Sequence, residues 1–237
     1  MATFVLIPGA GSDAWFWHLV EPELRVAGHD VVAVELPCED DAAGLAEYTD
    51  AVVAAIADRA GRDDLVVVGH SMGALTAPLV CARVSVALLV LVAAMTPQPG
   101  ETGAEWGANT GSGEARQRAA DAGGWSVDDE VALYLHDVPA DVVAASEAHQ
   151  LGQSGRPFED PWPLAAWPDV PTRFLLCRDD RCFPADLQRR VARERLGIVP
   201  DEMEGGHLPP LAHPEELSRR LLAYAAEVTG SPEARSR

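Results

Sequence analysis

The chain has 237 residues, of which 48% are hydrophobic, and it carries a net charge of −19. This length is enough for one large α/β domain with a sizeable core. The acidic surface disfavours binding to nucleic acid or to anionic membranes. All 18 basic residues are Arg, which excludes chemistry that depends on a lysine, such as Schiff-base formation.

No apolar run reaches the roughly 18 residues that a membrane helix needs. Met1 is followed by the apolar run 4–7 without a basic segment, so we expect no signal peptide and a cytoplasmic protein. The sequence implies no metal or organic cofactor. The four cysteines lack the spacing of a metal site and are expected to be reduced thiols in the core: Cys38, Cys81, Cys177 and Cys182.

Short apolar runs alternate with helical patterns over the first 95 residues. Runs of β-branched residues and Leu that are apolar almost throughout are typical of strands buried on both faces. Their alternation with helices predicts a parallel sheet. The predicted strands are 4–7, 31–34, 65–68 and 86–93, and the predicted helices are 15–27, 45–60 and 74–83.

The next part of the chain is rich in Gly, Pro, Ala and Trp, with helical pieces at 114–122, 127–135 and 140–150. An insert of helices between two parts of one parallel sheet predicts a cap over residues 96–171 on a core of residues 1–95 and 172–228. The polar tail, residues 229–237, is expected to be disordered. In the second part of the core we predict strands at 173–176 and 198–203 and helices at 185–196 and 214–228.

The segment Gly69-His70-Ser71-Met72-Gly73 has the Gly-x-Ser-x-Gly pattern of a nucleophile elbow between a strand and a helix. Such a turn lifts the serine hydroxyl above the sheet edge, and side chains two residues away on either side would collide. The next backbone N–H, that of Met72, points at the developing oxyanion from a helix N-terminus. We therefore predict Ser71 as a nucleophile, and we expect His70 to pack or to hydrogen-bond rather than to act as the base.

A serine nucleophile needs a histidine base and a carboxylate that fixes the tautomer of that base, in the chain order Ser, acid, His. His207 follows the strand 198–203 in a glycine-rich loop at the carboxyl edge of the sheet, where open α/β folds build their sites. For the acid we favour Asp180 and leave Asp179 as the alternative, since both follow the strand 173–176. The N–H of Ala10, in a loop of small residues, is the predicted second oxyanion donor.

Three further histidines follow Ser71 in the sequence. His213 precedes a proline at a predicted helix start, which favours a surface or capping role. We expect His136 and His149 to lie on solvated parts of the cap, with a place on the pocket wall as the alternative for His136 and Asp137. The cap is also the aromatic-rich part of the chain. Some of its aromatic residues should line an apolar pocket while others pack the cap on the core: Trp106, Trp125, Tyr134, Phe158, Trp162 and Trp167.

In these motifs the chain resembles α/β-hydrolases of the plant methylesterase and hydroxynitrile lyase group and their bacterial relatives. The resemblance covers most of the chain outside the cap and rests on residues 4–11 with 15–18, 69–73, 177–180 and 204–207. It implies the α/β-hydrolase fold, a mainly parallel twisted sheet flanked by helices with a helical cap insert. It also implies an esterase-like triad of Ser71, Asp180 and His207 with oxyanion donors at Ala10 and Met72.

The chain departs from this group at three positions. Pro8 replaces the usual His before Gly9, Gly9 stands where hydroxynitrile lyases have Thr, and Leu208 stands where they have Lys. Cyanohydrin cleavage needs that positive charge for the leaving cyanide, so these departures favour ester hydrolysis. We expect a small ester, apolar or aromatic, as substrate, with a thioester, a lactone or a carbon–carbon bond left open. The oligomeric state is open between a monomer and a homodimer.

Two other functions are compatible with parts of the sequence. Residues 9–14 fit the G-x-G-x-x-A pattern of dinucleotide-binding enzymes, and Glu35 ends the second strand as a ribose-binding acid would. That function leaves residues 69–73 unexplained and lacks the lysine that short-chain dehydrogenases need. A ligand-binding protein with a slow or inactive triad is the second alternative, because a fold does not determine a function.

Overall fold

One sheet of six parallel strands forms the centre of the molecule. The structure is a computed structural model that describes residues 1–59, 61 and 63–229. The strand order is β2-β1-β3-β4-β5-β6. The chain adds β2 on one side of β1 and β3 on the other side, so the order in which strands are added changes direction between β1 and β3. The predicted parallel sheet is therefore confirmed, and its strands are β1 Thr3–Ile7, β2 Asp30–Ala33, β3 Leu65–His70, β4 Leu88–Val92, β5 Thr172–Cys177 and β6 Asp201–Met203.

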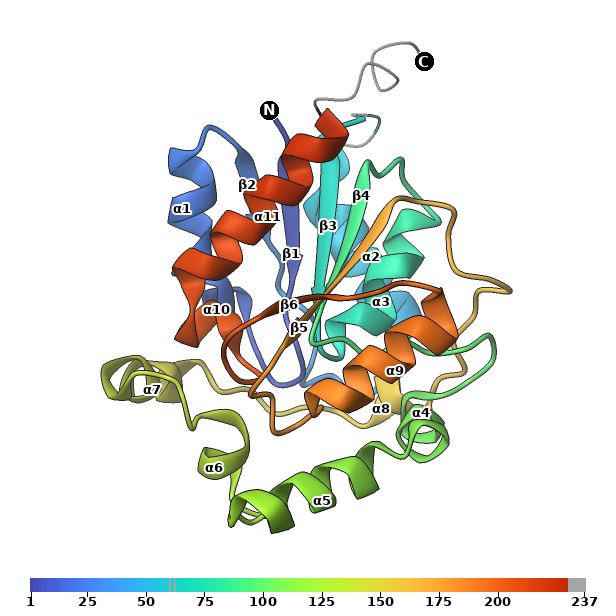
Figure 1. The fold of residues 1–237 in the computed structure, drawn as a ribbon. Coiled ribbons are helices and arrows are strands. Elements are labelled where there is room, and N and C mark those ends of the chain that lie inside the picture. Colours follow the sequence, from blue (N-terminus) through green and yellow to red (C-terminus); the bar gives the residue numbers. More distant parts are fainter. Residues whose placement is uncertain (60, 62, 230–237) are drawn as a thin grey trace.

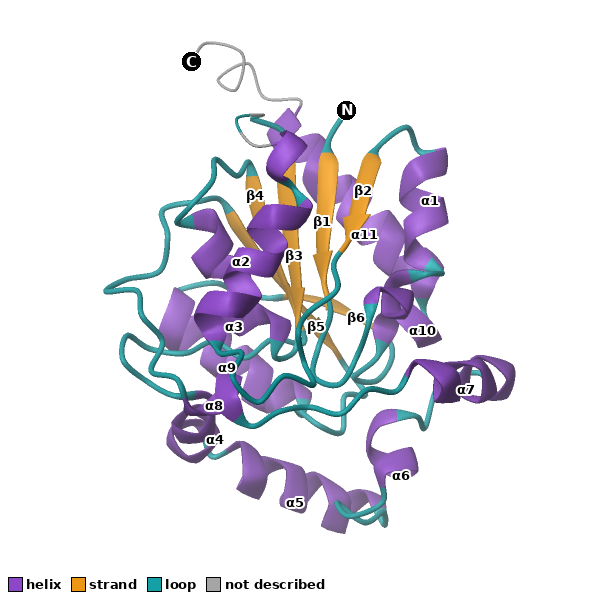
Figure 2. Cartoon of the chain, turned by 180° about the vertical axis from the view of Figure 1, so that it is seen from behind, coloured by secondary structure: helices purple, strands orange, loops and turns teal. Residues whose placement is uncertain are grey.

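Helices cover both faces of this sheet (Figures 1 and 2). Their bounds are α1 Val20–Val26, α2 Leu45–Ala55, α3 Gly73–Cys81, α9 Ala185–Leu196, α10 Pro209–Ala212 and α11 Pro214–Thr229, with the 3-10 helices η1 Ala14–Trp17 and η2 Ala57–Arg59. Successive strand residues face opposite sides of a sheet. Val67 belongs to the apolar cluster that contains residues of α2, α3 and α9, whereas its neighbour Val66 belongs to the cluster that contains residues of α1 and α11. Burial on both faces explains why the strands are apolar almost throughout.

The insert lies beyond the carboxyl ends of the strands, at the lower end of Figure 1. A buried ion pair between Glu101 and Arg195 of α9 ties its first residues to the core, with one N···O distance of 3.0 Å. The division into a core of 1–95 and 172–228 and a cap of 96–171 remains our proposal. The predicted tail lies outside the described residues from 230 onward. The cap helices are α4 Gly103–Thr110, α5 Ser112–Gly123, α6 Glu130–Tyr134, α7 Ala140–Ser146, η3 Glu147–His149 and α8 Arg156–Glu159.

Several predicted elements were wrong in extent. The helix predicted at 15–27 is two helices, η1 and α1, because the His18 ring stacks on Trp15 at 3.9 Å and its Nδ1–H donates to the Trp15 carbonyl, which closes the first one. The last strand is shorter than 198–203 because Pro200 has no N–H for the ladder. The cap helices at 127–135 and 140–150 are shorter as well, and the sequence did not predict α4, α8 or α10.

The four cysteines are free thiols, as predicted. Cys38, Cys177 and Cys182 are buried, and burial raises the pKa of Cys81 and of Cys182 to about 12, so these thiols stay protonated at neutral pH. Among the described residues, no group of three or more His, Cys, Asp or Glu side chains could hold a metal ion. No helix in the same ranges is long and apolar enough to cross a membrane.

Candidate active site

Ser71 lies in the sharp turn between β3 and α3, at the carboxyl end of the sheet. Its φ of +50° is a left-handed conformation that costs a non-glycine residue on the order of 1–3 kcal/mol. The two flanking glycines make the turn sterically feasible. A Cβ on Gly69 would lie 2.8 Å from the Cβ of Ala77, and one on Gly73 would lie 2.4 Å from the carbonyl oxygen of Pro8.

Three of the predicted side chains form one continuous set of hydrogen bonds. The Nε2 atom of His207 lies 2.9 Å from Ser71 Oγ, and its Nδ1 atom lies 2.9 Å from Asp180 Oδ2. A carboxylate can only accept, so Nδ1 of His207 carries the proton and Nε2 accepts the hydroxyl proton of Ser71. Asp180 and His207 are each only 3% exposed, which keeps water away from the hydrogen bond between them.

The two neighbouring aspartates face different surroundings. Asp180 is buried against His207, whereas Asp179 is exposed and its Oδ2 atom accepts the N–H of Gly205 at 3.3 Å. The Asp179 N–H in turn donates to the carbonyl oxygen of Gly205 at 3.0 Å. The structure thus brings Asp180 to the histidine, while Asp179 holds the turn that precedes His207.

Gln188 of α9 is a site residue that the sequence analysis missed. Its side-chain amide donates to Asp180 Oδ2 at 3.1 Å and to the carbonyl oxygen of Phe183 at 2.6 Å. The N–H of Phe183 donates to the other oxygen of Asp180 at 2.8 Å. Both oxygens of the carboxylate therefore accept hydrogen bonds from donors, which fixes the orientation of Asp180 beside His207. The available signal was a glutamine on the buried face of α9, next to Leu187.

His70 packs against His207. Its Nε2–H donates to the backbone oxygen of His207 at 2.7 Å, and the two rings lie 5.1 Å apart. Burial, and secondarily the nearby His207, lowers the pKa of His70 to about 3, so its ring is neutral at physiological pH. Its unprotonated Nδ1 faces Gly9, where an added Cβ would lie 2.8 Å away. His70 thus has the hydrogen-bonding role that the sequence suggested.

The loop that carries Ala10 meets the Ser71 turn where the strand order reverses. Ala10 follows β1 and Met72 follows β3, and both line the same cavity as Ser71. Open α/β sheets bind their ligands at such a switch point. The cap holds the Ala10 loop in place, because Gln153 Oε1 accepts the Gly11 N–H at 3.0 Å. This contact joins residues far apart in the sequence, and no local pattern predicts it.

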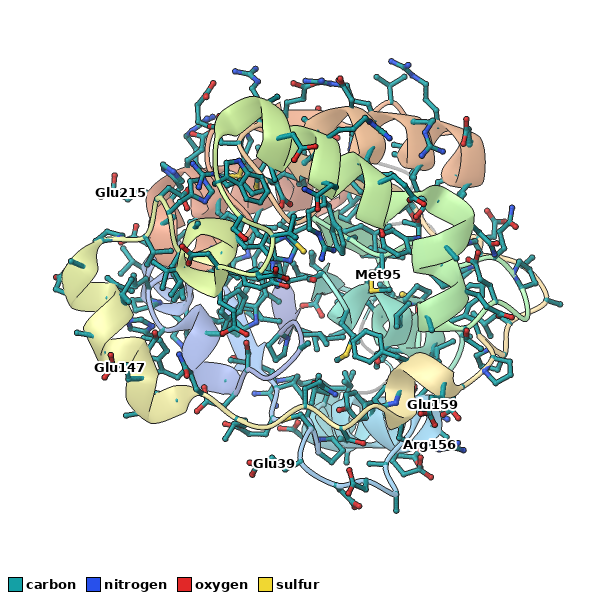
Figure 3. All side chains as sticks on the ribbon, turned by 90° about the horizontal axis from the view of Figure 1, so that it is seen from below. Glu39, Met95, Glu147, Arg156, Glu159 and Glu215 are labelled. Atoms are coloured by element: carbon teal, nitrogen blue, oxygen red, sulfur yellow. The ribbon has the colours of Figure 1, made fainter. Side chains whose placement is uncertain are left out.

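A cavity of about 600 Å³ lies between Ser71 and the cap, within the size range of small-molecule pockets. Met95, labelled in Figure 3, lines this cavity. Three of the six cap aromatics line the cavity: Trp106, Tyr134 and Phe158. The others pack elsewhere, with Trp162 bonded to the Leu75 carbonyl, Trp167 bonded to the Pro97 carbonyl and Trp125 stacked on Arg181.

The other histidines differ in part from the expectation. His149 lies in the largely exposed helix η3, as expected, but it also lines the cavity and its Nδ1 atom contacts Asp13 Oδ2 at 2.8 Å, which links the cap to the core. His136 lines a second cavity with Asp137 and His213. His213 caps α10 as expected, since its backbone N–H donates to the carbonyl oxygen of Pro209, and its Nε2 atom also lies 3.3 Å from Asp137 Oδ2 in the cap.

Comparisons with known proteins identify related sequences and related folds. The sequence profile of the alpha/beta hydrolase family matches residues 4–220. Probable esterase PIR7A from Oryza sativa subsp. indica is 36% identical over 107 residues, and this match covers 41% of each chain. Methylesterase 1 from Arabidopsis thaliana is 24% identical, covering 94% of this chain and 95% of that protein. The crystal structure of polyneuridine aldehyde esterase superposes with a TM-score of 0.76 at 19% identity, covering 95% of this chain and 99% of that one.

Proposed function

The chain belongs to the alpha/beta hydrolase family, and from this membership and the geometry of the site we propose that it is a serine esterase that cleaves a small carboxylic ester. The observation that carries the proposal is the pair of 2.9 Å contacts that joins Ser71 to His207 and His207 to Asp180. The curated relatives named as esterases and methylesterases support the choice of an ester. We further propose that the enzyme is cytoplasmic and needs no cofactor, and that it is either a monomer or a homodimer.

In the first step Ser71 Oγ attacks the ester carbonyl while Nε2 of His207 takes the hydroxyl proton. The carbonyl oxygen becomes an oxyanion that the N–H groups of Ala10 and Met72 stabilise, with each well-placed donor worth about 3 kcal/mol. Asp180 stabilises the imidazolium that forms and keeps its ring in position. The tetrahedral intermediate then collapses, the C–O bond to the alcohol breaks, and His207 gives its proton to the departing oxygen.

In the second step water releases the acyl group from Ser71. His207 is neutral again after the alcohol has left, so it takes a proton from a water molecule that attacks the acyl carbon. The same two N–H groups stabilise the second oxyanion. Collapse of this intermediate breaks the bond to Ser71 Oγ, which regains its proton from His207, and the carboxylic acid leaves.

The surroundings of Gly9 and Gly11 argue against the competing chemistries. A threonine at position 9, as in hydroxynitrile lyases, would push its Cβ to 2.8 Å from His70 Nδ1. A dinucleotide phosphate on residues 9–14 would need free backbone N–H groups, but the Gly11 N–H donates to Gln153 and the Gly11 carbonyl accepts from Leu151 at 3.2 Å. Cap residues therefore occupy the loop that such a cofactor would use.

Hydrolysis of 4-nitrophenyl acetate and of a panel of methyl esters tests the proposal. We expect measurable turnover by the wild type and a loss of about 10³-fold or more in Ser71→Ala, since the variant has no nucleophile. Ser85→Ala is the matched control, because Ser85 is exposed and does not line the cavity. Equal rates for the wild type and Ser71→Ala would favour a ligand-binding protein on this fold instead.

A further inference from the structure

The wall of the cavity carries a guanidinium group in addition to the triad residues, and it belongs to Arg116 on α5. It is the single Arg among the described residues that line the cavity. Its Nε–H donates to the backbone oxygen of Cys182 at 3.1 Å, and no described carboxylate lies within ion-pair distance of it. A guanidinium has five N–H donors, so the terminal nitrogens of Arg116 remain free to bind a ligand.

Tyr134 provides a second donor at the same place. Its hydroxyl oxygen lies 3.8 Å from the sulfur of Cys182, the residue whose backbone oxygen contacts Arg116. The thiol donates in this contact, and no described residue accepts the proton of the Tyr134 hydroxyl. Burial raises the pKa of Tyr134, so the hydroxyl stays protonated and can donate at neutral pH. Arg116 and Tyr134 therefore meet at Cys182 with unused donors on both.

These two donors lie on the His207 side of the cavity. The Tyr134 ring is 5.7 Å from the His207 ring, and Phe183, which follows Cys182, is 5.0 Å from it in an edge-on contact. His207 delivers its proton to the departing alcohol oxygen, so the alcohol part of an ester must lie on this side. A group carried on the alcohol would therefore face the donors of Arg116 and Tyr134.

We propose that Arg116 and Tyr134 form a subsite for a carboxylate carried on the alcohol part of the ester. The inference rests on the ester hydrolysis proposed above and narrows its substrate class. Water and an acyloxy carboxylate would give a carboxylic acid and a hydroxy carboxylate. Of the two carboxylates on the cavity wall, Asp13 is paired with His149, and Glu130 is exposed. The acidic protein repels anions elsewhere, so this subsite would decide which anionic ester binds.

The test compares 4-acetoxybutanoate with its neutral counterpart 4-acetoxybutanamide. A hydrogen bond to a charged group contributes about 1.5–3 kcal/mol, so we expect kcat/KM of the wild type to be about tenfold or more higher for the carboxylate. Arg116→Gln should lose about tenfold on the carboxylate and less than about twofold on the amide. Tyr134→Phe should lose a smaller factor, again on the carboxylate alone. Arg118→Gln, an exposed residue of the same helix, should leave both rates unchanged.

Three outcomes would overturn the subsite. The first is an equal kcat/KM for the two substrates, and the second is an equal loss of kcat/KM on the carboxylate in Arg116→Gln and Arg118→Gln. The third is a preference for a carboxylate only when it is carried on the acyl part of the ester, measured with monomethyl succinate against methyl succinamate. Failure of the hydrolase proposal would look different, because neither substrate nor 4-nitrophenyl acetate would be turned over. Calorimetry of 4-acetoxybutanoate and its amide with Ser71→Ala tests the subsite in that case, and equal affinities would refute it.

Discussion

Replacing Asp180 by Asn changes the hydrogen bonds at the base without changing the size of the side chain. One oxygen of Asp180 accepts the Phe183 N–H at 2.8 Å, and the other accepts from His207 at 2.9 Å and from Gln188 at 3.1 Å. An amide has only one acceptor oxygen. If that oxygen stays on Phe183, the NH₂ group faces the Gln188 donor and donates to His207 Nδ1, which moves the ring proton to Nε2. In that tautomer His207 cannot accept the proton of Ser71.

To act as a base, His207 must give up the hydrogen bond from the new amide, and its imidazolium then lacks the carboxylate as a partner. At about 0.5–1.5 kcal/mol for the neutral bond and about 1.5–3 kcal/mol for the bond to charge, the barrier rises by about 2–4.5 kcal/mol, or roughly 30- to 2000-fold in kcat. The assay is hydrolysis of 4-nitrophenyl acetate at saturating substrate, with circular dichroism to check folding. Asp179→Asn is the control and should retain most of the activity, since Asp179 bonds only to the Gly205 turn. A folded Asp180→Asn within tenfold of wild type would refute this reasoning.

Two predictions concern stability and are measured by urea unfolding. Gly9→Ala should lower the free energy of unfolding by about 1–3 kcal/mol, because its Cβ would lie 2.8 Å from His70 Nδ1. Gly113→Ala in α5 meets no atom within 4 Å and should be neutral or stabilising. Equal effects of the two substitutions would contradict the steric argument. Glu101→Gln should cost about 3–5 kcal/mol at pH 7 because it leaves the buried Arg195 unpaired. Burial opposes ionisation of Glu101, but its hydrogen bonds, above all the one from Arg195, lower its pKa. The stabilisation by the ionised carboxylate is therefore complete above about pH 4.5 and is lost as the pH falls below that value. A stability difference between Glu101→Gln and the wild type that did not shrink in acid would refute this account.

The core of the fold and the residues that meet at the candidate site could be predicted because their signals are local. Buried strands are continuous apolar runs, and a Gly-x-Ser-x-Gly turn between strand and helix leaves little steric freedom around Ser71. The same local signals favoured Asp180 over Asp179 as the acid but could not decide between them. The two residues are adjacent and chemically identical, and only the burial of Asp180 against His207 separates them.

The cap was predicted less well because long-range contacts shape it. Gln153 and His149 bond to the Gly11 loop and to Asp13, more than a hundred residues away. One local signal was present and missed. Thr102 and Glu105 form a capping box at the start of α4, with N–H···O distances of 3.0 and 2.9 Å, and this pattern could have predicted that helix.

The identity of the nucleophile is the central claim, and covalent labelling tests it most directly. A fluorophosphonate phosphonylates an activated serine, and trypsin then releases residues 63–83, in which Ser71 is the only serine. We predict one adduct per chain, located at Ser71 and absent from Ser71→Ala. An adduct that persists in Ser71→Ala, or a folded wild type that takes up no label, would contradict the account.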